Sequence, residues 1–534
     1  MATTGQDATT TDREYREQRL AEARERRTTT AELNTSRTYI EHPKNDDETE
    51  FPSGIACFTK GLPHDDNGEP DASEYEELLN VLESGDFSGV TLGGDRPLVN
   101  PEASRSFNST GLDPHDIFVP AAPGMDSDRT AAEMIEVYWQ ALCRDVEFSD
   151  YDTAGVIDDA ADEIDAQVAQ TDFDAPTDGG TVTPETGFRG SLSGCETGPY
   201  VSQFLYWEVP RGVFSHHQQF EPLKEDTEYM TDFGEWLRIQ RGKYPATGNG
   251  DIPSNEDLPR ENQRYITTGR DLATYVRVDR PQLAYLNAAL ILQSMDAPLD
   301  RGNPFEESSI DYGHNDAQSA VVGITNAAFH AAWYHKWQVH RRLRPEAYGG
   351  RVRNLKEGVA TTSAYNVPSR LLDSEAVSRT HSEHGTYLLS QAYPEGSPTH
   401  PSYPAGHSTV AGACVTVLKA FYDTSHEFDE VKAPDPTDPT DLDDVGVGKS
   451  VTVGGELNKL AANIAIGRDW AGVHYRTDAT AGFALGERLA IGMLAVRLRA
   501  KGTRSSFRLE TFGGNEVLIT PNGVESSTLL QDGR

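Results

Sequence analysis

Apolar residues recur along much of the chain at the spacing of an amphipathic helix. After Thr130, with Glu133 completing a capping-box spacing, the apolar positions 134, 137, 138, 141 and 142 fall on one helical face. The same period predicts further helices at about 281–295, 315–343, 380–392, 408–422, 456–466 and 478–500. Alternation typical of strands is sparse and is clearest near 507–519. The pattern predicts a mainly α protein, a helical bundle with long loops and minor β-hairpins.

Changes in polarity predict three parts of the chain. Residues 1–50 are charged, Thr-rich and poor in aromatic residues, which predicts a flexible acidic or polar N-terminal tail with a helical fragment around 12–27. Residues 51–300 are predicted to form an N-terminal helical region that supplies packing contacts. Residues 301–525 are predicted to form a C-terminal helical bundle that carries the candidate chemistry.

The composition is strongly acidic. Among 534 residues, 85 Asp and Glu oppose 47 Lys and Arg, a formal net charge of −38. Nucleic acids and anionic membranes are bound by basic surfaces, so neither is an expected partner. Two segments, 157–187 and 424–449, are acidic and rich in Pro, Gly and Thr, which predicts surface insertions. The charge fits either simple solubility or a halophilic protein, because at about 1 M salt the Debye length is only about 3 Å.

The chain shows no targeting or membrane-spanning signal. No stretch approaches roughly 18 consecutive apolar residues, and the first thirty residues hold no apolar signal core. We therefore expect a soluble, cytoplasmic protein. The four cysteines, Cys57, Cys143, Cys195 and Cys414, are too widely spread to predict disulfides or thiolate metal sites.

Cationic and imidazole groups concentrate in three segments, the first of which is WYHKWQVHRRLRPEAYGG at 333–350. On a continuous helix Lys336, His340 and Arg344 would form one slowly turning stripe. Pro345 disfavours α geometry at Arg344, which would free its guanidinium at the helix end. Two cationic donors can then converge on one point, although a solvated basic helix face fits the segment equally well.

The second segment, HPSYPAGHSTV, holds two histidines around a stiff elbow of small residues. Gly406 lets the backbone approach a ligand, and Ser408 is predicted to cap the helix that follows. His407 then lies at a helix N-terminus, where free N–H groups and the helix dipole favour an anion. Taken alone, a histidine in this position is more often structural.

The third segment is IGRDWAGVHYRTDATAGFALGERL at 466–489. Arg468 and His474 would not share a face of one helix, but a break at Gly472 could bring them together. Asp478 is predicted to cap the last helix. The alternative interpretation is a turn with a surface arginine and a core histidine.

Together the three segments describe a site for a tetrahedral oxyanion. Lys336, Arg344 and Arg468 would neutralise its charge, and His407 and His474 would supply two imidazoles. The sequence contains no HExxH motif, Walker loop or GxSxG elbow that would indicate other chemistry. The anion itself is therefore the predicted cofactor or substrate.

This combination resembles the Lys…Arg-Pro, Ser-Gly-His, Arg…His signature shared by vanadium-dependent haloperoxidases and type 2 phosphatidic acid phosphatases. The spacing from Lys336 to Arg344 is the longer one found in algal and cyanobacterial bromoperoxidases, which the chain resembles most. Other similar stretches are HPSYP before the Gly-His pair, GPYVSQFL at 198–205 and YWQALCRDV at 138–146. The resemblance covers roughly residues 50–520.

The resemblance implies a helical bundle that binds vanadate and assembles as a homo-oligomer. It implies vanadate bonded to His474, an acid–base role for His407, and an oxyanion cage formed by Lys336, Arg344, Arg468 and the Gly406 backbone N–H. The implied activity uses hydrogen peroxide, with vanadium as a Lewis acid, to oxidise bromide or iodide and halogenate small organic acceptors.

Residues around this cage carry further expectations. The resemblance places His400, and with it Trp333, on the halide side, whereas a core role is the alternative for Trp333. His340 could touch the cage, but helix packing is favoured. Ala405 replaces the family's serine, and the loss of a hydrogen bond worth about 1.5–3 kcal/mol would weaken vanadate binding or peroxide activation. The alternatives are a soluble phosphatase with His474 as nucleophile and a non-catalytic oxyanion-binding protein.

Overall fold

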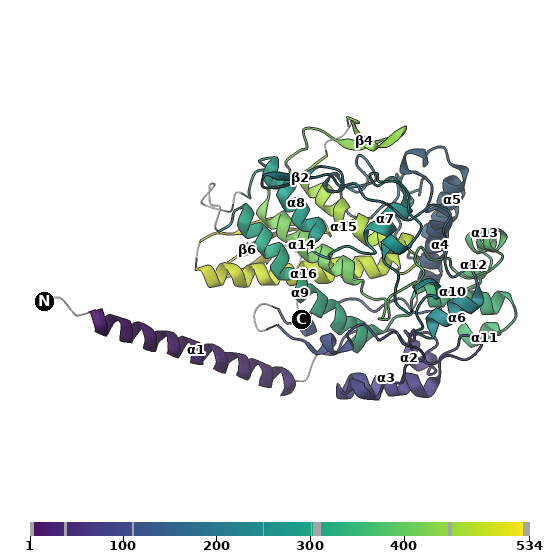
Figure 1. Cartoon of the computed structure of the whole chain (residues 1–534), viewed down its shortest axis with the longest axis horizontal. Coiled ribbons are helices and arrows are strands. Elements are labelled where there is room, and N and C mark those ends of the chain that lie inside the picture. The colour runs from purple at the N-terminus through teal and green to yellow at the C-terminus, as the bar shows by residue number, and fades with distance from the viewer. Residues whose placement is uncertain are drawn as a thin grey trace.

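The computed structural model describes residues 5–36, 40–108, 112–248, 250–300, 302, 311–446, 451–502 and 504–526. Helices dominate these residues (Figure 1). The α-helices are α1 (Gly5–Ser36), α2 (Asp47–Glu50), α3 (Ala72–Ser84), α4 (Asp128–Cys143), α5 (Gly155–Gln170), α6 (Phe233–Gln240), α7 (Gly269–Tyr275), α8 (Leu283–Ser294), α9 (His314–Tyr334), α10 (Pro345–Lys356), α11 (Thr362–Tyr365), α12 (Ser369–Leu372), α13 (Glu375–His384), α14 (Gly406–Phe421), α15 (Val453–Trp470) and α16 (Arg476–Lys501). Short 3-10 turns lie at Phe87–Gly89, Pro101–Arg105, Pro114–Asp116, Phe148–Asp150, Gln203–Leu205, Ala246–Gly248 and Asn255–Asp257. The prediction of a mainly α protein is confirmed.

The strands form small antiparallel units at the edges of the helices. They are β1 (Val209–Arg211) with β2 (Phe214–His216), β3 (Lys432–Asp435) with β4 (Asp438–Asp444), and a three-stranded sheet of β5 (Phe507–Glu510), β6 (Glu516–Thr520) and β7 (Gly523–Ser526). Phe507 pairs with Ile519 in this sheet, in the part of the chain where alternation predicted strands. The minor β-hairpins are therefore present as expected.

Helix α14 lies at the centre of the bundle. It packs against α16, α9 and α15, and its apolar side chains are buried. The backbones of α14 and α16 approach closely because both carry glycine at the contact: a Cβ atom at Gly486 would lie 2.1 Å from the Thr409 carbonyl oxygen, and one at Gly412 would lie 2.5 Å from the Phe483 carbonyl oxygen. No side chain fits in either place. This contact holds the two helices at a fixed distance.

The N-terminal segment differs from its prediction in helix length. The helix α1 covers Gly5–Ser36, whereas the sequence predicted a fragment at 12–27. In Figure 1 α1 extends away from the other helices. The division of the remaining chain at about residue 300 stays a prediction. The largest cluster of buried apolar side chains takes residues from both sides of that point.

Two predicted helix ends are wrong. The helix predicted at 315–343 is α9 followed by one π-helical turn, His335–His340, and it ends at Arg341, whose φ of 42° is left-handed. The helix predicted at 380–392 is α13, which ends at His384 because Gly385 has a φ of 70°. Apolar periodicity continues past both points, so it did not indicate either end.

The two acidic segments predicted as insertions have different structures. The first includes most of α5, which buries Ile157, Ala160 and Ile164, so this half is part of the bundle. The second forms the β3–β4 hairpin, whose strand β4 is mostly exposed. Only the second matches the predicted surface insertion.

One helix among the described residues, α16, is long and apolar enough to span a membrane by length and composition. Of its most apolar window, 67% is buried inside the protein. This burial is typical of a core helix, and α16 packs along α14 accordingly. The four cysteines are buried and unpaired.

Candidate active site

Arg344 is the centre of the predicted cage. Its Nη1 donates to His474 Nε2 at 2.9 Å and to the Val473 carbonyl oxygen at 2.8 Å. Its Nη2 donates to His400 Nδ1 at 3.0 Å and to the His400 carbonyl oxygen at 2.9 Å. Arg344 is 1% exposed. It therefore joins all three of the segments that the sequence singled out.

Lys336 and Arg468 complete the buried cations of the site. Lys336 Nζ donates to the carbonyl oxygens of Pro401 and Ser402 at 2.7 and 2.6 Å. Arg468 Nη1 donates to the Val276 carbonyl oxygen at 3.1 Å, while its buried Nε has no partner in the described part of the chain. The pKa of Lys336 is lowered by burial, by Arg344 and by Arg468, so these three cations lie within electrostatic reach of one another.

Lys336 and Arg344 do not share a helix, contrary to the predicted stripe. The π-helical turn ends at His340, and Arg344 has extended backbone (φ −81°, ψ 150°) immediately before Pro345 opens α10. The guanidinium is freed by that extended residue, as proline geometry requires. His340 points away from the cage: its ring stacks on His335 and meets Tyr403 edge-on.

His474 is held in a defined neutral form. Its Nδ1 lies 2.7 Å from Asp478 Oδ2, so the ring donates its proton there, and its Nε2 accepts from Arg344. Burial and then Arg344 lower the pKa of His474 well below 6.5. Burial alone would raise the pKa of Asp478, but Arg342 and His474 together lower it below its ordinary value. The Nε2 lone pair therefore faces the cations.

The chain breaks at Gly472 between Arg468 and His474, as predicted. Helix α15 ends at Trp470, and Gly472 has the left-handed φ of 80° that this break requires. Asp478 also accepts from the Tyr475 N–H at 3.2 Å at the start of α16. The N-cap is Tyr475, so Asp478 contributes to the capping box from the third helical position rather than as the cap itself. It also orients His474, which the sequence did not indicate.

His407 lies in the first turn of α14, as predicted, and pairs with a residue that the sequence did not single out. Its Nε2 is 3.1 Å from Asp279 Oδ1, and its side chain is 24% exposed. Asp279 is in the loop after α7, with no local motif to mark it. Ser408 does not cap the helix: the N-cap is Ala405, and among the described residues no side chain caps that end.

His400 and Trp333 form one wall beside the elbow. Their ring centroids are 4.8 Å apart, and Trp333 Nε1 donates to the Val99 carbonyl oxygen at 3.1 Å. A Cβ atom at Gly406 would lie 3.1 Å from the Trp333 ring, so glycine is the residue that fits there. Burial, Lys336 and Arg344 lower the pKa of His400 well below 6.5.

Ser402 lies close to His474 but does not replace the missing serine at position 405. Its hydroxyl donates to Asp478 and lies 3.4 Å from His474 Nδ1. That nitrogen is on the opposite edge of the ring from Nε2. Ser402 thus supports the Asp478–His474 pair, and Ala405 leaves its own position without a hydroxyl.

The site fits an anion held by a histidine. Burial lowers the pKa of Arg344 to about 9, with Arg468 adding to the effect and Asp478 opposing it. The Arg344 guanidinium donates to carbonyl oxygens and imidazole nitrogens and to no carboxylate of the described residues. Free donors on Arg468 and the uncapped N-terminus of α14 add to the positive potential. The residues present thus suit the vanadate that the resemblance implies.

Comparisons with known proteins show what the chain is similar to. Residues 319–500 match the family model of the VCPO second helical-bundle domain. The chain is 34% identical to a vanadium-dependent bromoperoxidase of Ascophyllum nodosum, over 90% of this chain and 88% of that protein. It is 32% identical to one of Corallina officinalis, over 89% of this chain and 92% of that one.

A solved structure shows the same fold. The homohexameric second vanadate-dependent bromoperoxidase (AnII) of Ascophyllum nodosum superposes with a TM-score of 0.84 at 28% identity, covering 95% of this chain and 91% of that chain. The protein is a haloperoxidase of the helical-bundle class. It belongs to the vanadium-dependent bromoperoxidase family.

Proposed function

We propose that the protein binds vanadate and uses hydrogen peroxide to oxidise bromide or iodide, which then halogenates small organic acceptors. The observation that carries the proposal is the neutral His474, whose Nε2 faces Arg344 while its Nδ1 is held by Asp478. The residues that would hold vanadate are His474, Lys336, Arg344, Arg468 and the Gly406 N–H. When bound, vanadate supplies a Lewis acid that needs no change of oxidation state.

The chain's own groups have separate roles in this proposal. Asp478 fixes the tautomer of His474 with the proton on Nδ1, so Nε2 carries the lone pair on the side of the cations. Lys336 and Arg344 provide positive charge in a site from which water is largely excluded, where each charge acts strongly. His407 can take up or release a proton at Nε2, and Asp279 orients that ring.

Bromination of an organic acceptor by the metal-free protein, before and after vanadate is added, tests the proposal. We expect turnover that requires both vanadate and peroxide and that is lost in His474→Ala. His381→Ala, on the surface helix α13, is the matched control. Hydrolysis of a phosphate ester without peroxide, in the absence of bromination, would instead identify a phosphatase. Vanadate binding without either turnover would identify an oxyanion-binding protein.

We also propose that the protein is a homo-oligomer. The support is the structural match to AnII, which is homohexameric. Light scattering after size-exclusion chromatography gives the mass directly, and a mass of 58.5 kDa, that of a single chain, would contradict the proposal.

A further inference from the structure

A cavity of about 680 Å³ lies where the two acidic segments meet the bundle. Thr177, Asp178 and Glu185 line it from the first segment, and the β3–β4 hairpin lines it from the second. In Figure 1 β4 stands at the upper edge of the molecule. None of the cage residues lines this cavity. Its volume is in the range of sites for small organic ligands.

Aromatic rings form the inner wall of this cavity. Phe148 and Tyr200 stack with centroids 3.9 Å apart and planes at 12°. Tyr151 meets both rings edge-on, at 5.5 and 5.9 Å. Aromatic faces carry negative partial charge and attract cations. The Arg189 guanidinium already lies over the Tyr200 ring, 5.4 Å from its centroid. The half-buried Phe148 ring is therefore the apolar surface offered to a further positive charge.

One polar group in this wall is left unsatisfied. Tyr151 is 5% exposed, and its hydroxyl has no hydrogen-bond partner among the residues described. The hydroxyl oxygen is itself buried, so Tyr151 offers the cavity its ring and not its hydroxyl. The hydroxyls of Tyr200 and Tyr206, by contrast, donate to the carbonyl oxygens of Phe188 and Ile266.

The charged residues of the cavity are almost all acidic. Six carboxylates line it: Glu147, Asp152, Asp178, Glu185, Glu196 and Asp435. Arg189 is the cation in the lining, and its donors are used internally, on the carbonyl oxygens of Cys195 at 2.7 Å and Gly198 at 3.2 Å. The cavity thus has negative potential around an aromatic wall.

We propose that this cavity binds an organic cation, an ammonium group carried on an aromatic or alkyl body. The carboxylates attract the ammonium charge, and Phe148 and Tyr151 cover the body. The site is additional to the haloperoxidase site and requires no turnover there.

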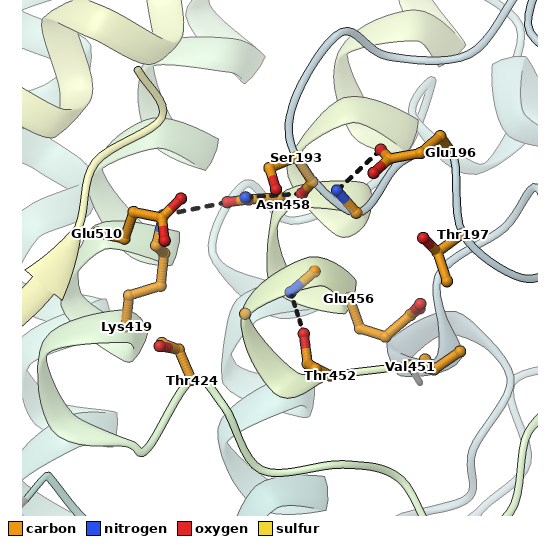
Figure 2. Close-up of a pocket in the computed structure, with 13 residues that line it drawn as sticks. Ser193, Glu196, Thr197, Lys419, Thr424, Val451, Thr452, Glu456, Asn458 and Glu510 are labelled. Carbon is orange, nitrogen blue, oxygen red and sulfur yellow. Dashed lines mark hydrogen bonds between the residues drawn. The ribbon is translucent and has the colours of Figure 1, made fainter. Parts of the chain in front are cut away.

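A second, smaller cavity differs from the first in that none of the described residues that line it is aromatic. It has a volume of about 240 Å³ and shares Glu196 with the larger one (Figure 2). Its polar groups pair with one another: Lys419 donates to Asn458 Oδ1 at 3.2 Å, and the Gly455 N–H donates to Thr452 Oγ1 at 3.1 Å. We assign no ligand to it.

Calorimetric titration with benzyltrimethylammonium, at fixed ionic strength, tests the proposal. Benzoate and benzyl alcohol are the anionic and neutral controls. We expect the ammonium to bind at least about tenfold more tightly than either control, because cation–π and Coulomb attraction both favour it. Equal binding of the three compounds, or no binding of the ammonium, would overturn the proposal.

Substitutions locate the binding. Phe148→Leu removes a ring of the wall and is expected to weaken ammonium binding about fivefold. Phe214→Leu makes the same change on the β1–β2 hairpin, where the side chain is 75% exposed, and is expected to leave binding unchanged. Equal affinity of Phe148→Leu and the wild type would place the ligand elsewhere and overturn the assignment.

A charge-neutralising pair remains informative if Phe148→Leu fails to fold. The double variant Asp178→Asn with Glu185→Gln alters two exposed carboxylates of the cavity and is expected to weaken ammonium binding about threefold. The variant Glu76→Gln with Glu83→Gln makes an equal change in net charge on α3. Equal weakening by both pairs would show that only the overall charge attracts the probe, and would overturn the proposal.

Discussion

Two groups of buried cations lie side by side in this protein and are compensated differently. In the cage, Lys336 and Arg344 donate to backbone carbonyl oxygens and to imidazole nitrogens. Burial lowers the pKa of Arg344 to about 9 and that of Lys336 well below 10.5. Among the described residues, neither cation has a carboxylate as a direct hydrogen-bond partner, although Asp478 attracts both from nearby, so their charge remains available to an anion.

The neighbouring group is a closed ion-pair network. Arg342 donates to Glu133 Oε2 at 2.7 Å and to Asp478 Oδ1 at 2.9 Å. Arg476 pairs with Glu136 in the same layer. Burial would lower the pKa of Arg342 and Arg476, but the carboxylates raise both above 12.5.

The difference separates cations that support the fold from cations that bind a ligand. Asp478 belongs to both groups, because one oxygen pairs with Arg342 and the other holds His474. The ion-pair network therefore holds His474 in place through Asp478, while the cations of the neighbouring cage remain able to bind an anion. Burial alone does not distinguish the two groups, whereas the identity of the partners does.

The largest expected effect is the difference in unfolding free energy between two variants. One lacks a cation of the ion-pair network, and the other lacks a cation of the cage. Arg342→Met leaves Glu133 and Asp478 buried without their partner and is expected to lower the free energy of unfolding by about 3–5 kcal/mol. Arg344→Met strands no carboxylate, so a smaller loss is expected, together with loss of vanadate binding. Urea unfolding of both variants measures the difference. Equal destabilisation by the two substitutions would contradict the comparison.

A bound tetraoxo anion should stabilise the protein through the cage. At 100 times its dissociation constant, vanadate is expected to raise the free energy of unfolding by about 2.7 kcal/mol. Thermal unfolding across a vanadate titration measures this gain. Arg344→Met should show none of it, whereas the exposed variant Arg19→Met should retain it. The same rise in both variants would place the anion outside the cage.

Ala405→Ser restores the hydroxyl that the family signature contains. We expect vanadate to bind about tenfold more tightly, since a hydrogen bond to a charged group contributes about 1.5–3 kcal/mol. Equilibrium dialysis measures the constant. Ala411→Ser, in the interior of α14, is the matched control. Unchanged affinity in Ala405→Ser would mean that another donor already serves this position.

The smallest expected effect is the dependence of stability on pH. The pKa values of His400 and His474 are lowered below 6.5 in the folded protein, so the unfolded chain binds more protons as the pH falls. Stability is therefore lost on acidification, by about 0.8 kcal/mol per imidazole between pH 8 and pH 6. Urea unfolding at pH 6, 7 and 8 measures this loss of stability. In His400→Gln the loss should be smaller by the contribution of one imidazole. Stability that rises as the pH falls would contradict the assignment.

Much of the cage could be predicted from the sequence because its residues occur in short motifs with local geometric meaning. Pro345 required extended backbone at Arg344, and Gly472 supplied the turn between Arg468 and His474. The mainly α fold followed from periodicity in the same way. These features depend on residues close together in the chain.

The features that were missed depend on contacts between distant segments. Asp279 meets His407 across 128 residues, and Arg342 meets Glu133 across 209. The pattern of apolar residues did not indicate the π-helical turn that ends at His340. Ser408 was expected to cap α14, yet it is buried and Ala405 takes the N-cap position. The roles assigned to individual cage residues stay predictions until they are tested.

The glycine contact between α14 and α16 fixes how the starts of these two helices lie relative to each other at the site. Gly406 and Asp478 stand near the starts of these two helices, so their spacing is set where Gly412 and Gly486 let main chain touch main chain. A slip of one turn would shift one start by about 5.4 Å relative to the other. The glycines at this contact therefore determine the geometry of the pocket even though none of their atoms needs to touch the anion.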